Sequence, residues 1–374
     1  MNLTLDAGAE KIIETLEEKG YKAYAVGGCV RDLLLGKIPD DYDVATSAFP
    51  EEVIAVFGRE NVATTGLKHG TVTVILKGKP FEVTTFRSES GYSDHRRPDS
   101  VKFVGSLAED LKRRDFTVNA VAYNGKEGLI DLYGGLSDLE NGVIRAVGDP
   151  YERFSEDALR ILRAARFSAA LGFKVEEKTA RAAEELAKDL EKVSEERIFA
   201  ELTKLLAGKN ATETLLKFHG VIFAAIPELG PCYKFLQRSK WHRYDVYEHT
   251  ARAVGYVKGG AVEKWTMLLH DIGKPDCFSV KDGEGHFYGH NLRSAEIAKA
   301  VLKRLKAPKA FSEKVVTLVS VHDKPIRFTS AAVKREMSAI GKDLFSSLLE
   351  VKRADNLAQG TPLALSETGN ADKL

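Results

Sequence analysis

The stretch AYAVGGCVRDLLLG (residues 23–36) decides the fold of the N-terminal part of the chain. The apolar run before its glycine pair predicts a short strand, and the leucines after it predict a helix. Gly27 and Gly28 let the backbone approach a ligand closely, and the start of the following helix presents free N–H groups to an anion. Arg31 and Asp32 lie in the first turn of that helix. The stretch therefore predicts a turn that binds an anionic group such as a phosphate.

Two carboxylates follow this turn in the stretch DDYDVATS (40–47). If the segment is a strand, the alternating Asp41 and Asp43 lie on the same face. Two carboxylates on one face suit Mg²⁺, which takes few carboxylates together with substrate phosphates. Two such ions would activate a hydroxyl and stabilise a leaving pyrophosphate, and Glu82 in FEVTTFR (81–87) is a third candidate acid. Glycine pairs and paired aspartates are each common as structural features, so only their combination indicates chemistry.

A third motif, DLKRRDFTVNA (110–120), supplies groups of the opposite charge. Arg113 and Arg114 are suited to neutralise triphosphate charge. Asp115 and Asn119 are suited to hydrogen-bond ribose hydroxyls. A purely structural alternative is that Asp115 caps a helix.

The composition predicts an ordinary globular protein of more than one domain. The chain has 374 residues, 44% of them apolar, and a net charge of +1, so nucleic acid must be bound by local basic surfaces. Its cysteines, Cys29, Cys232 and Cys277, form no CxxC motif, which argues against a thiolate zinc site and fits a reducing cytosol. The Glu- and Lys-rich N-terminus lacks the apolar run of a signal peptide, and no run is long enough to span a membrane. We expect a cytoplasmic protein that does not contact membranes.

Strand patterns are confined to the first part of the chain. Runs of period two or of β-branched residues occur at 71–76, 81–86 and 101–104, and such runs fade after about residue 145. Helical patterns follow. The predicted domains are an α+β head with a mixed β-sheet (1–145), an all-α neck that binds the base and RNA (146–210), an all-α body (211–335) and a short C-terminal tail (336–374).

The neck segment DPYERFSEDALRILRAARF (149–167) predicts one helix, on which Asp157 and Arg160 share a face and Arg163 and Arg166 lie near that side. Cytosine and adenine both present an amine donor beside a ring-nitrogen acceptor. A carboxylate next to a guanidinium matches that order, whereas guanine and uracil would leave these charges unpaired. The spacing is equally typical of an ordinary ion pair on a solvated helix face.

The C-terminal half is rich in histidine and aspartate, in the segments YEHTARAV, LLHDIGKP, HFYGHNLRSAE and LVSVHDKP. An adjacent His-Asp pair with further histidines provides mixed nitrogen and oxygen ligands, which suit Mn, Fe, Co, Ni or Zn better than Mg. Such a site activates water for attack on a phosphoester, with Lys274 near the phosphate. A single histidine is more often a core or capping residue, and a degenerate site stays an alternative.

The head and neck motifs resemble the class II, bacterial-type tRNA nucleotidyltransferases, the CCA-adding enzymes. The matching pieces occur in family order, from VGGCVRDLLLG and DYDVATS through HGTVTV, EVTTFR, YSDHRRPDSVKF and LKRRDFTVNA to SEDALRILRAARF and SEERIFAELTKLL, and cover about residues 20–207. The resemblance implies a polymerase-β-like nucleotidyltransferase head. Its implied activity is the addition of C, C and A to the 3′ end of tRNA from CTP and ATP, with Mg²⁺ and without a template.

The resemblance also implies residue roles. Asp41 and Asp43 would bind Mg²⁺, and Glu156 would steady Arg160 in the set that selects the nucleotide. The implied nucleotide-binding residues are Gly27, Gly28, Arg31 and Asp32 at the triphosphate, Arg113 and Asp115 at the ribose, and Glu156, Asp157 and Arg160 at the base; Asn119, Arg163 and Arg166 are candidates from their positions alone.

The loop GYSDHRRPDS (91–100) bears on the product. A loop here is needed in this family for the final A, so its presence favours CCA or A-only addition. Bacterial poly(A) polymerase shares the head, but in those enzymes a GRRF-type sequence follows the acidic residues, and the chain carries basic extensions. This chain instead reads VFGRENVATTGLKHGTVTV and has no basic tail, which favours tRNA.

Residues 240–330 resemble the HD phosphohydrolase superfamily. The resemblance implies hydrolysis of a 2′,3′-cyclic phosphate or a phosphomonoester during repair of tRNA 3′ ends, with Mn, Ni, Fe or Co. Relatives carry a further helical tail that grips tRNA, whereas this chain stops soon after KRADNLAQ (352–359). Other interpretations are an HD hydrolase with a nucleotide-sensing head and a non-catalytic RNA-binding protein; the oligomeric state is undetermined. The implied HD ligands are His249, His270, Asp271 and Asp323, with His290 and His322 for a second metal.

Overall fold

The computed structural model describes residues 3–90, 100–326 and 329–362. The chain divides into two compact units. It passes from the first to the second within helix α7 (Leu159–Leu171), returns after residue 172 and crosses again after residue 186. The first unit holds residues 1–160 and 173–186, and the second holds 161–172 and 187–374.

The mixed sheet predicted for the first unit is confirmed. It has seven strands among the described residues, in the order β3-β4-β5-β2-β1-β8-β9. Strands β2 and β5 pair in parallel, and the other neighbouring strands described in this sheet pair antiparallel. The strands are β1 (Ala23–Val26), β2 (Asp43–Thr46), β3 (Val62–Ala63), β4 (Thr71–Leu76), β5 (Lys79–Thr85), β8 (Val121–Asn124) and β9 (Gly128–Asp131).

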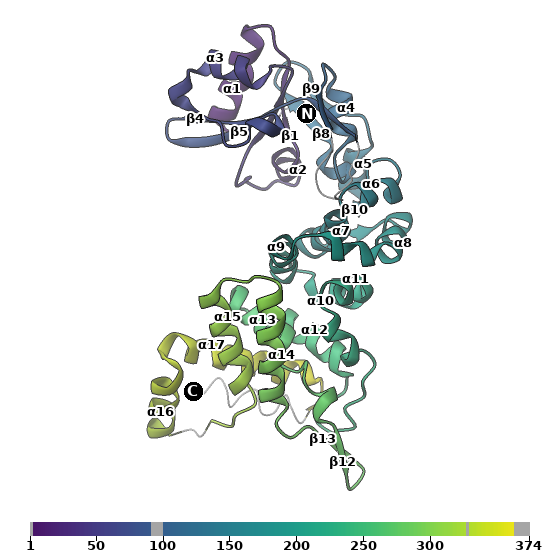
Figure 1. The fold of residues 1–374 in the computed structure, drawn as a ribbon, viewed down its shortest axis with the longest axis vertical. Coiled ribbons are helices and arrows are strands. Elements are labelled where there is room, and N and C mark those ends of the chain that lie inside the picture. Colours follow the sequence, from purple (N-terminus) through teal and green to yellow (C-terminus); the bar gives the residue numbers. More distant parts are fainter. Residues whose placement is uncertain (1–2, 91–99, 327–328, 363–374) are drawn as a thin grey trace. The chain divides into compact units, whose positions relative to one another are not determined.

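The two faces of this sheet bury different side chains. Helix α1 (Ala7–Glu18) buries Ile12, Ile13 and Leu16 on one face, together with Ala23 and Ala25 of β1. The alternate β1 residues face the other way, into a cluster with Phe86 and Leu111. Figure 1 shows α1 and α3 (Pro50–Phe57) beside β4 and β5. The period-two alternation thus fixes which side of β1 meets the helices.

Shorter elements complete the unit around the sheet. Strands β6 and β7 form a separate antiparallel pair, and β10 pairs in parallel with β11. These elements are α2 (Gly28–Leu34), β6 (Arg87–Ser90), β7 (Ser100–Phe103), α4 (Leu107–Lys112), α5 (Gly135–Asn141), β10 (Val143–Ile144), α6 (Pro150–Glu156), β11 (Lys174–Val175) and α8 (Glu177–Glu185).

The neck is not the single helix that the sequence predicts. Helix α6 ends at Glu156, and Asp157 adopts an extended conformation with φ −137° and ψ 102° before α7 begins at Leu159. The Asp157 carboxylate accepts a hydrogen bond from the Leu159 N–H at 3.1 Å, so it caps the new helix. Asp157 and Arg160 are therefore not neighbours on one helical face.

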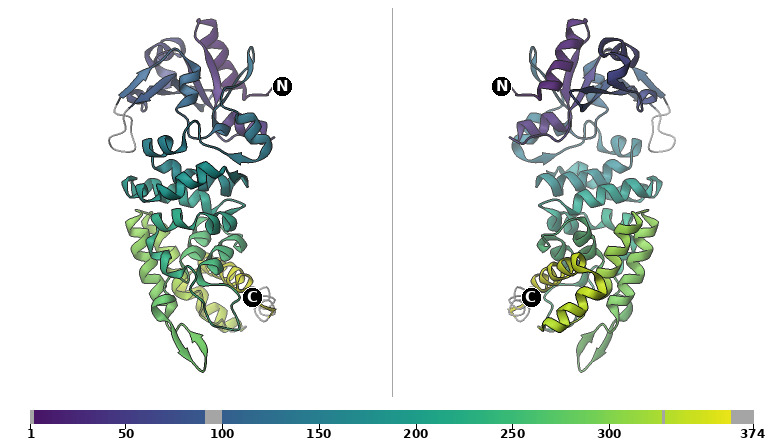
Figure 2. Two further views of the ribbon diagram at one scale, coloured as in Figure 1. Left: turned by 90° about the vertical axis from the view of Figure 1, so that its right-hand side faces the viewer. Right: turned by 90° about the vertical axis from the view of Figure 1, so that its left-hand side faces the viewer.

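Over its described residues, the second unit is helical apart from one small hairpin, β12–β13, which projects from the helices (Figures 1 and 2). Helices α14 and α15 pack side by side, and Trp265 of α13 stacks on Phe199 of α9. The elements are α9 (Glu195–Leu206), α10 (Ala211–Lys217), α11 (His219–Ala225), α12 (Val246–Tyr256), α13 (Ala261–Leu269), β12 (Ser279–Lys281), β13 (Glu284–His286), α14 (His290–Arg304), α15 (Lys309–Val321), α16 (Ser330–Ile340) and α17 (Lys342–Gln359).

The boundary predicted at residue 335 does not follow this packing. Helix α17 lies against α12, α13 and α15, and it buries Phe345, Leu348, Val351 and Ala354. Residues that the sequence assigned to a tail thus form part of the helical core. Among the helices described, none is long and apolar enough to cross a membrane.

Candidate active sites

In the head, the sheet brings two acidic residues together. Asp43 begins β2 and lies in register with Glu82 of β5, so the two residues are direct neighbours on adjacent parallel strands. Asp43 also faces Val26 at the end of β1, one residue before the glycine turn. Asp41 precedes β2 and is exposed, so the predicted alternation along one strand is replaced by a strand residue and a loop residue.

The glycine turn itself lies against this acidic pair. Gly27 has φ +78°, and a Cβ built there would lie 2.9 Å from Nη1 of Arg114 and 3.6 Å from Oδ2 of Asp43. A larger residue would meet both a backbone penalty and the guanidinium. The predicted turn is thus in place at the N-terminus of α2, next to Asp43.

The charges around Asp43 fit a divalent cation. Burial raises the pKa of Asp43 to about 6, Arg114 opposes this shift, and Glu82 and Asp41 reinforce it. The shift comes first from burial and only then from the neighbouring carboxylates, so a cation bound here would stabilise the ionised form of Asp43. Carboxylate oxygens in excess of nearby cations form the donor set that Mg²⁺ prefers.

A hydrogen-bonded chain joins the predicted triphosphate and ribose residues. Arg31 binds Asp32 through Nε and Nη2, at 2.9 and 2.8 Å, and donates through Nη1 to Asn119 at 2.7 Å. Asn119 in turn donates to Oδ1 of Asp115 at 3.0 Å. That same oxygen accepts the N–H of Phe116 at 2.8 Å. Residues from two distant motifs thus form one rigid polar strip.

Asp110 anchors the arginine pair, a role that the sequence did not indicate. Its side chain is fully buried and lies 2.7 Å from Arg113 and 3.2 Å from Arg114. Burial by itself would raise the pKa of Asp110, but the two guanidinium groups hold it below its ordinary value. The only available signal was its position three and four residues before the arginines, within one helical turn.

In the neck, Arg160 is held by groups that set its direction. Its Nη1 lies 2.7 Å from Glu156, the partner implied by the family resemblance, and its Nη2 donates to the carbonyl oxygen of Arg113 at 2.9 Å. Glu156 also pairs with Arg153. Arg163 and Arg166 instead belong to the second unit, where Glu201 lies 3.7 and 2.7 Å from them. The structure therefore gives these two arginines a partner in the helical body.

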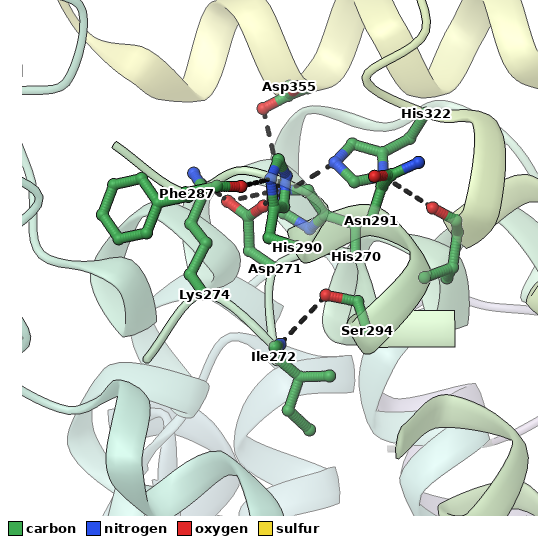
Figure 3. Close-up of polar contacts among 12 residues, drawn as sticks. His270, Asp271, Ile272, Lys274, Phe287, His290, Asn291, Ser294, His322 and Asp355 are labelled. Atoms are coloured by element: carbon green, nitrogen blue, oxygen red, sulfur yellow. Dashed lines mark hydrogen bonds and ion pairs between the residues drawn. The ribbon is translucent and has the colours of Figure 1, made fainter. Parts of the chain in front are cut away.

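The second candidate site is a buried cluster of histidines around Asp271 (Figure 3). The Nε2 atoms of His249 and His270 lie 3.3 and 3.2 Å from Oδ2 of Asp271. The Nε2 atoms of His290 and His322 lie 3.4 and 3.7 Å from its other oxygen, Oδ1. Asp271 thus separates two histidine pairs, one at each carboxylate oxygen.

Backbone contacts fix how these rings point. The Nδ1 atoms of His270, His290 and His322 each lie 2.7 to 2.8 Å from the carbonyl oxygen three residues earlier. Because Nδ1 then carries a proton, Nε2 is the ring nitrogen that faces Asp271 and that can bind a metal ion once it is deprotonated. Such orientation by the other ring nitrogen is the usual arrangement of metal-binding histidines.

The aspartate that lies with His249 and His270 is Asp355 rather than the predicted Asp323. Asp355 of α17 places Oδ1 3.0 Å from Nε2 of His249, and His249, His270 and Asp355 form a group with metal-binding geometry. Asp323 is exposed and belongs to neither such group among the described residues. The packing of α17 explains the correction, because it brings a residue from the presumed tail into the core. The sequence signal was the aspartate in KRADNLAQ (352–359).

The electrostatics of this cluster also fit a cation. Burial would lower the pKa of His270, yet Asp271 and Asp355 raise it to about 10. Two carboxylates thus retain a proton on a fully buried imidazole, which indicates a deficit of positive charge. The nitrogen-rich donor set suits Mn, Fe, Co, Ni or Zn. Lys274 lies 2.6 Å from Oδ2 of Asp271, at the edge of a cavity of about 340 Å³.

Three family models match successive parts of the chain. They are described as the Poly A polymerase head domain (residues 23–145), the probable RNA and SrmB-binding site of polymerase A (172–229) and the HD domain (242–360). The last match includes α17 and therefore Asp355.

Matches to individual proteins identify the family more specifically than these three models do. The crystal structure of the Bacillus stearothermophilus CCA-adding enzyme in complex with CTP is 33% identical, with a TM-score of 0.74, and the alignment covers 97% of this chain and 81% of that chain. The chain belongs to the CCA-adding enzyme family, with an HD domain in its second unit.

Two further CCA-adding enzymes match over part of their length. That of Leuconostoc mesenteroides is 54% identical over 207 residues, which is 55% of this chain and 51% of the relative. That of Enterococcus faecalis is 44% identical over 269 residues, which is 72% of this chain and 63% of the relative. The chain thus spans about half the length of the first of these relatives.

Proposed function

We propose that this protein adds C, C and A to the 3′ end of tRNA from CTP and ATP without a nucleic-acid template. The observation that carries the proposal is the pairing of Asp43 and Glu82 on adjacent strands, directly beside the Gly27 turn. The family of named CCA-adding enzymes supports tRNA as the acceptor.

In this reaction the 3′ oxygen of the RNA bonds to the α-phosphorus of the nucleotide, and the bond to the β-phosphate oxygen breaks to release pyrophosphate. Mg²⁺ bound by Asp41 and Asp43 would activate the attacking hydroxyl and stabilise the leaving group, with Glu82 as a nearby third acid. Arg113 and Arg114, both held by Asp110, neutralise triphosphate charge. The Arg31–Asn119–Asp115 strip orients the triphosphate and the ribose.

Base choice is assigned to Arg160 and Asp157. The guanidinium of Arg160 is almost buried and is held by Glu156 and the Arg113 carbonyl, so its donors keep a set direction. The Arg160 donors, together with the Asp157 carboxylate at the start of α7 as an acceptor, would match cytosine and adenine and leave guanine and uracil with unpaired groups.

The test uses a tRNA that lacks its CCA end, Mg²⁺ and one labelled nucleotide at a time. Incorporation of C and then A, without G or U, is the expected result. Addition of A to a tRNA that already ends in CC, without any addition of C to the tRNA that lacks CCA, would establish an A-adding enzyme instead. Long A tails on an unstructured RNA would establish a poly(A) polymerase, and no addition at all would remove the transferase proposal.

A second activity is proposed for the HD domain: metal-dependent hydrolysis of a phosphoester, such as the 2′,3′-cyclic phosphate of a damaged tRNA end. The supporting observation is that four Nε2 atoms converge on the two oxygens of a fully buried Asp271. With Mn²⁺, Ni²⁺ or Co²⁺ bound there, the metal would supply an activated water. Lys274 is placed to contact the phosphate.

Hydrolysis of adenosine 2′,3′-cyclic phosphate by the purified protein, with each metal in turn, tests this activity. His270→Ala should abolish it. If wild-type protein that contains metal is inactive on both cyclic phosphates and phosphomonoesters, the HD proposal fails while the transferase proposal stands.

A further inference from the structure

A fifth histidine, which the sequence did not indicate, lies against the cluster around Asp271. His242 lies shortly before helix α12 and lines the same cavity as Asp271. Its ring lies 5.4 Å from that of His249, at an angle of 76°. His242 belongs to neither of the groups with metal-binding geometry among the described residues. It therefore lies beside the ligand set and not within it.

His249 differs from the other histidines of the cluster in how its ring is held. His270, His290 and His322 lie at helix ends, where nearby backbone carbonyl oxygens are free to bind Nδ1. His249 lies inside α12, where the carbonyl oxygens belong to the helical hydrogen-bond ladder. Its Nδ1 atom is accordingly buried and has no hydrogen-bond partner among the described residues. The ring of His249 thus lacks the orienting contact that the other three rings have.

His242 carries a group that can supply this contact. Its Nδ1 atom is also buried and also has no hydrogen-bond partner in the described part of the chain. A neutral imidazole donates a hydrogen bond at one ring nitrogen and accepts one at the other. If Nε2 of His249 binds a metal ion, its Nδ1 carries a proton and needs an acceptor. Because buried polar groups are rarely left unpaired, Nδ1 of His242 is a fitting acceptor.

The separation of the two rings fits a direct hydrogen bond between them. His249 and His270 provide a reference, since their ring centroids lie 5.2 Å apart and their Nε2 atoms 3.1 Å apart. The centroid distance of 5.4 Å between His242 and His249 is nearly the same. The two Nδ1 atoms can therefore meet after a rotation of the His242 ring about its side-chain torsions, without a change in the backbone.

The backbone next to His242 is tied to helix α17. The N–H of Arg243 donates to the carbonyl oxygen of Gln359 at 3.0 Å. The same helix carries Asp355, whose Oδ1 lies 3.0 Å from Nε2 of His249. His242 and Asp355 are thus held in one frame, in which each lies next to His249.

We propose that His242 orients His249 as a metal ligand by accepting a hydrogen bond from its Nδ1, in place of the backbone carbonyl oxygen that orients the other three histidines. His242 is accordingly a positioning residue of the HD site. The proposal rests on the metal-dependent activity proposed above and adds a residue that sets how tightly the metal is bound. Loss of such an outer partner typically weakens metal binding by about 10- to 100-fold.

Calorimetric titration of metal-free, full-length protein with Mn²⁺ tests the proposal without any turnover. His242→Phe keeps an aromatic ring but removes the nitrogen, and it should weaken Mn²⁺ binding by about tenfold or more. His242→Asn places an amide oxygen near the position of Nδ1 and should bind Mn²⁺ nearly as tightly as wild type. The matched control is His286→Ala, because His286 lines the same cavity but stacks on Tyr288 and not on a ligand ring.

The visible absorption bands of bound Co²⁺ report the geometry of the ligands, which a general loss of packing does not mimic. The bands should shift in His242→Phe and keep their wild-type form in His242→Asn, with circular dichroism to confirm that each variant is folded. Equal Mn²⁺ affinity of His242→Phe and wild type, or equal losses in His242→Phe and His242→Asn, would overturn the proposal. Metal binding by wild type without hydrolysis would remove only the HD activity, whereas a wild-type protein that binds no metal would reject both.

Discussion

Asp110 shows how one buried charge organises the head. Its carboxylate is fully buried and forms ion pairs with Arg113 and Arg114. The carbonyl oxygen of Arg113 in turn accepts a hydrogen bond from Arg160. The triphosphate-binding and base-reading groups thus depend on one side chain that contacts neither ligand in the proposed mechanism. Asp110 is accordingly a positioning residue.

Replacing Asp110 with Asn should release both guanidinium groups. We expect a loss of stability of about 3 kcal/mol, because two charges lose their buried partner. We also expect KM for CTP and ATP to rise more than kcat falls, since the arginines act on the bound triphosphate. Denaturant unfolding and steady-state kinetics measure both effects. Asp110→Glu should recover part of the affinity, and unchanged KM values in Asp110→Asn would contradict this role.

The raised pKa of Asp43 predicts that the Mg²⁺ requirement of nucleotide addition depends on pH. Its pKa of about 6 lies above the ordinary value because of burial, so a proton competes with Mg²⁺ as the pH falls through 6. The deprotonated fraction falls about tenfold from pH 7 to pH 5, and the Mg²⁺ concentration for half-maximal CTP addition should rise by about the same factor. Titrations of Mg²⁺ at pH 5, 6 and 7 measure this shift. A constant half-maximal concentration would show that Asp43 does not titrate in this range.

At the scale of elements, the break between α6 and α7 separates two roles that one helix would combine. Glu156 ends α6 and steadies Arg160, whereas Asp157 leaves helical geometry and caps α7. The sequence pattern is strongly helical throughout, so the break depends on a local carboxylate–backbone bond that competes with helix propagation.

Asp157→Ala tests this interpretation. The loss of the cap should reduce stability by about 1 kcal/mol. In addition, selection of C and A over G and U should weaken, because the carboxylate acceptor is lost. Thermal unfolding and incorporation of each labelled nucleotide measure the two effects. As a comparison, Asp149→Ala removes the cap of α6, to which Tyr151 N–H donates, and should reduce stability without relaxed selection. Equal selectivity in all three proteins would assign Asp157 to capping alone.

Helix α17 is the element that completes the HD cluster, because it brings Asp355 to within 3.0 Å of His249. Asp355→Asn should therefore lower the amount of transition metal bound per protein, whereas Asp323→Asn, at an exposed position, should not change it. Metal analysis of the purified variants measures this difference. If Asp323→Asn loses metal and Asp355→Asn retains it, the assignment first made from the sequence holds and the structural one fails.

At the scale of the molecule, the two candidate sites lie in separate compact units, and each has its own set of acidic residues. The donor atoms of the two sites also differ, since one site is built from carboxylates and the other mainly from imidazoles. The two activities should therefore be separable by mutation.

Asp43→Asn should abolish nucleotide addition and leave phosphoester hydrolysis unchanged, and Asp271→Asn should do the reverse. Both assays are run on the same preparations, with circular dichroism to confirm folding. If Asp271→Asn also stops addition by a folded protein, the two-site model is wrong.

The sequence by itself determined the local motifs: the glycine turn, the acidic residues, the arginine pair and the histidines. These signals are local because they follow from the period of a strand or a helix and from the chemistry of neighbouring side chains. Residues 91–99, which hold nearly all of the loop linked to the final A, lie outside the described residues and add nothing to that prediction.

Only the tertiary structure decided which distant groups meet. The register of β2 and β5 pairs Asp43 with Glu82, and the packing of α17 replaces Asp323 by Asp355. The tertiary structure also shows that Asp110 pairs with the arginines of its motif and that Glu201 pairs with Arg166. The physical reason is that such contacts depend on the burial of whole elements against one another, and the spacing of residues along one segment carries no information about that packing.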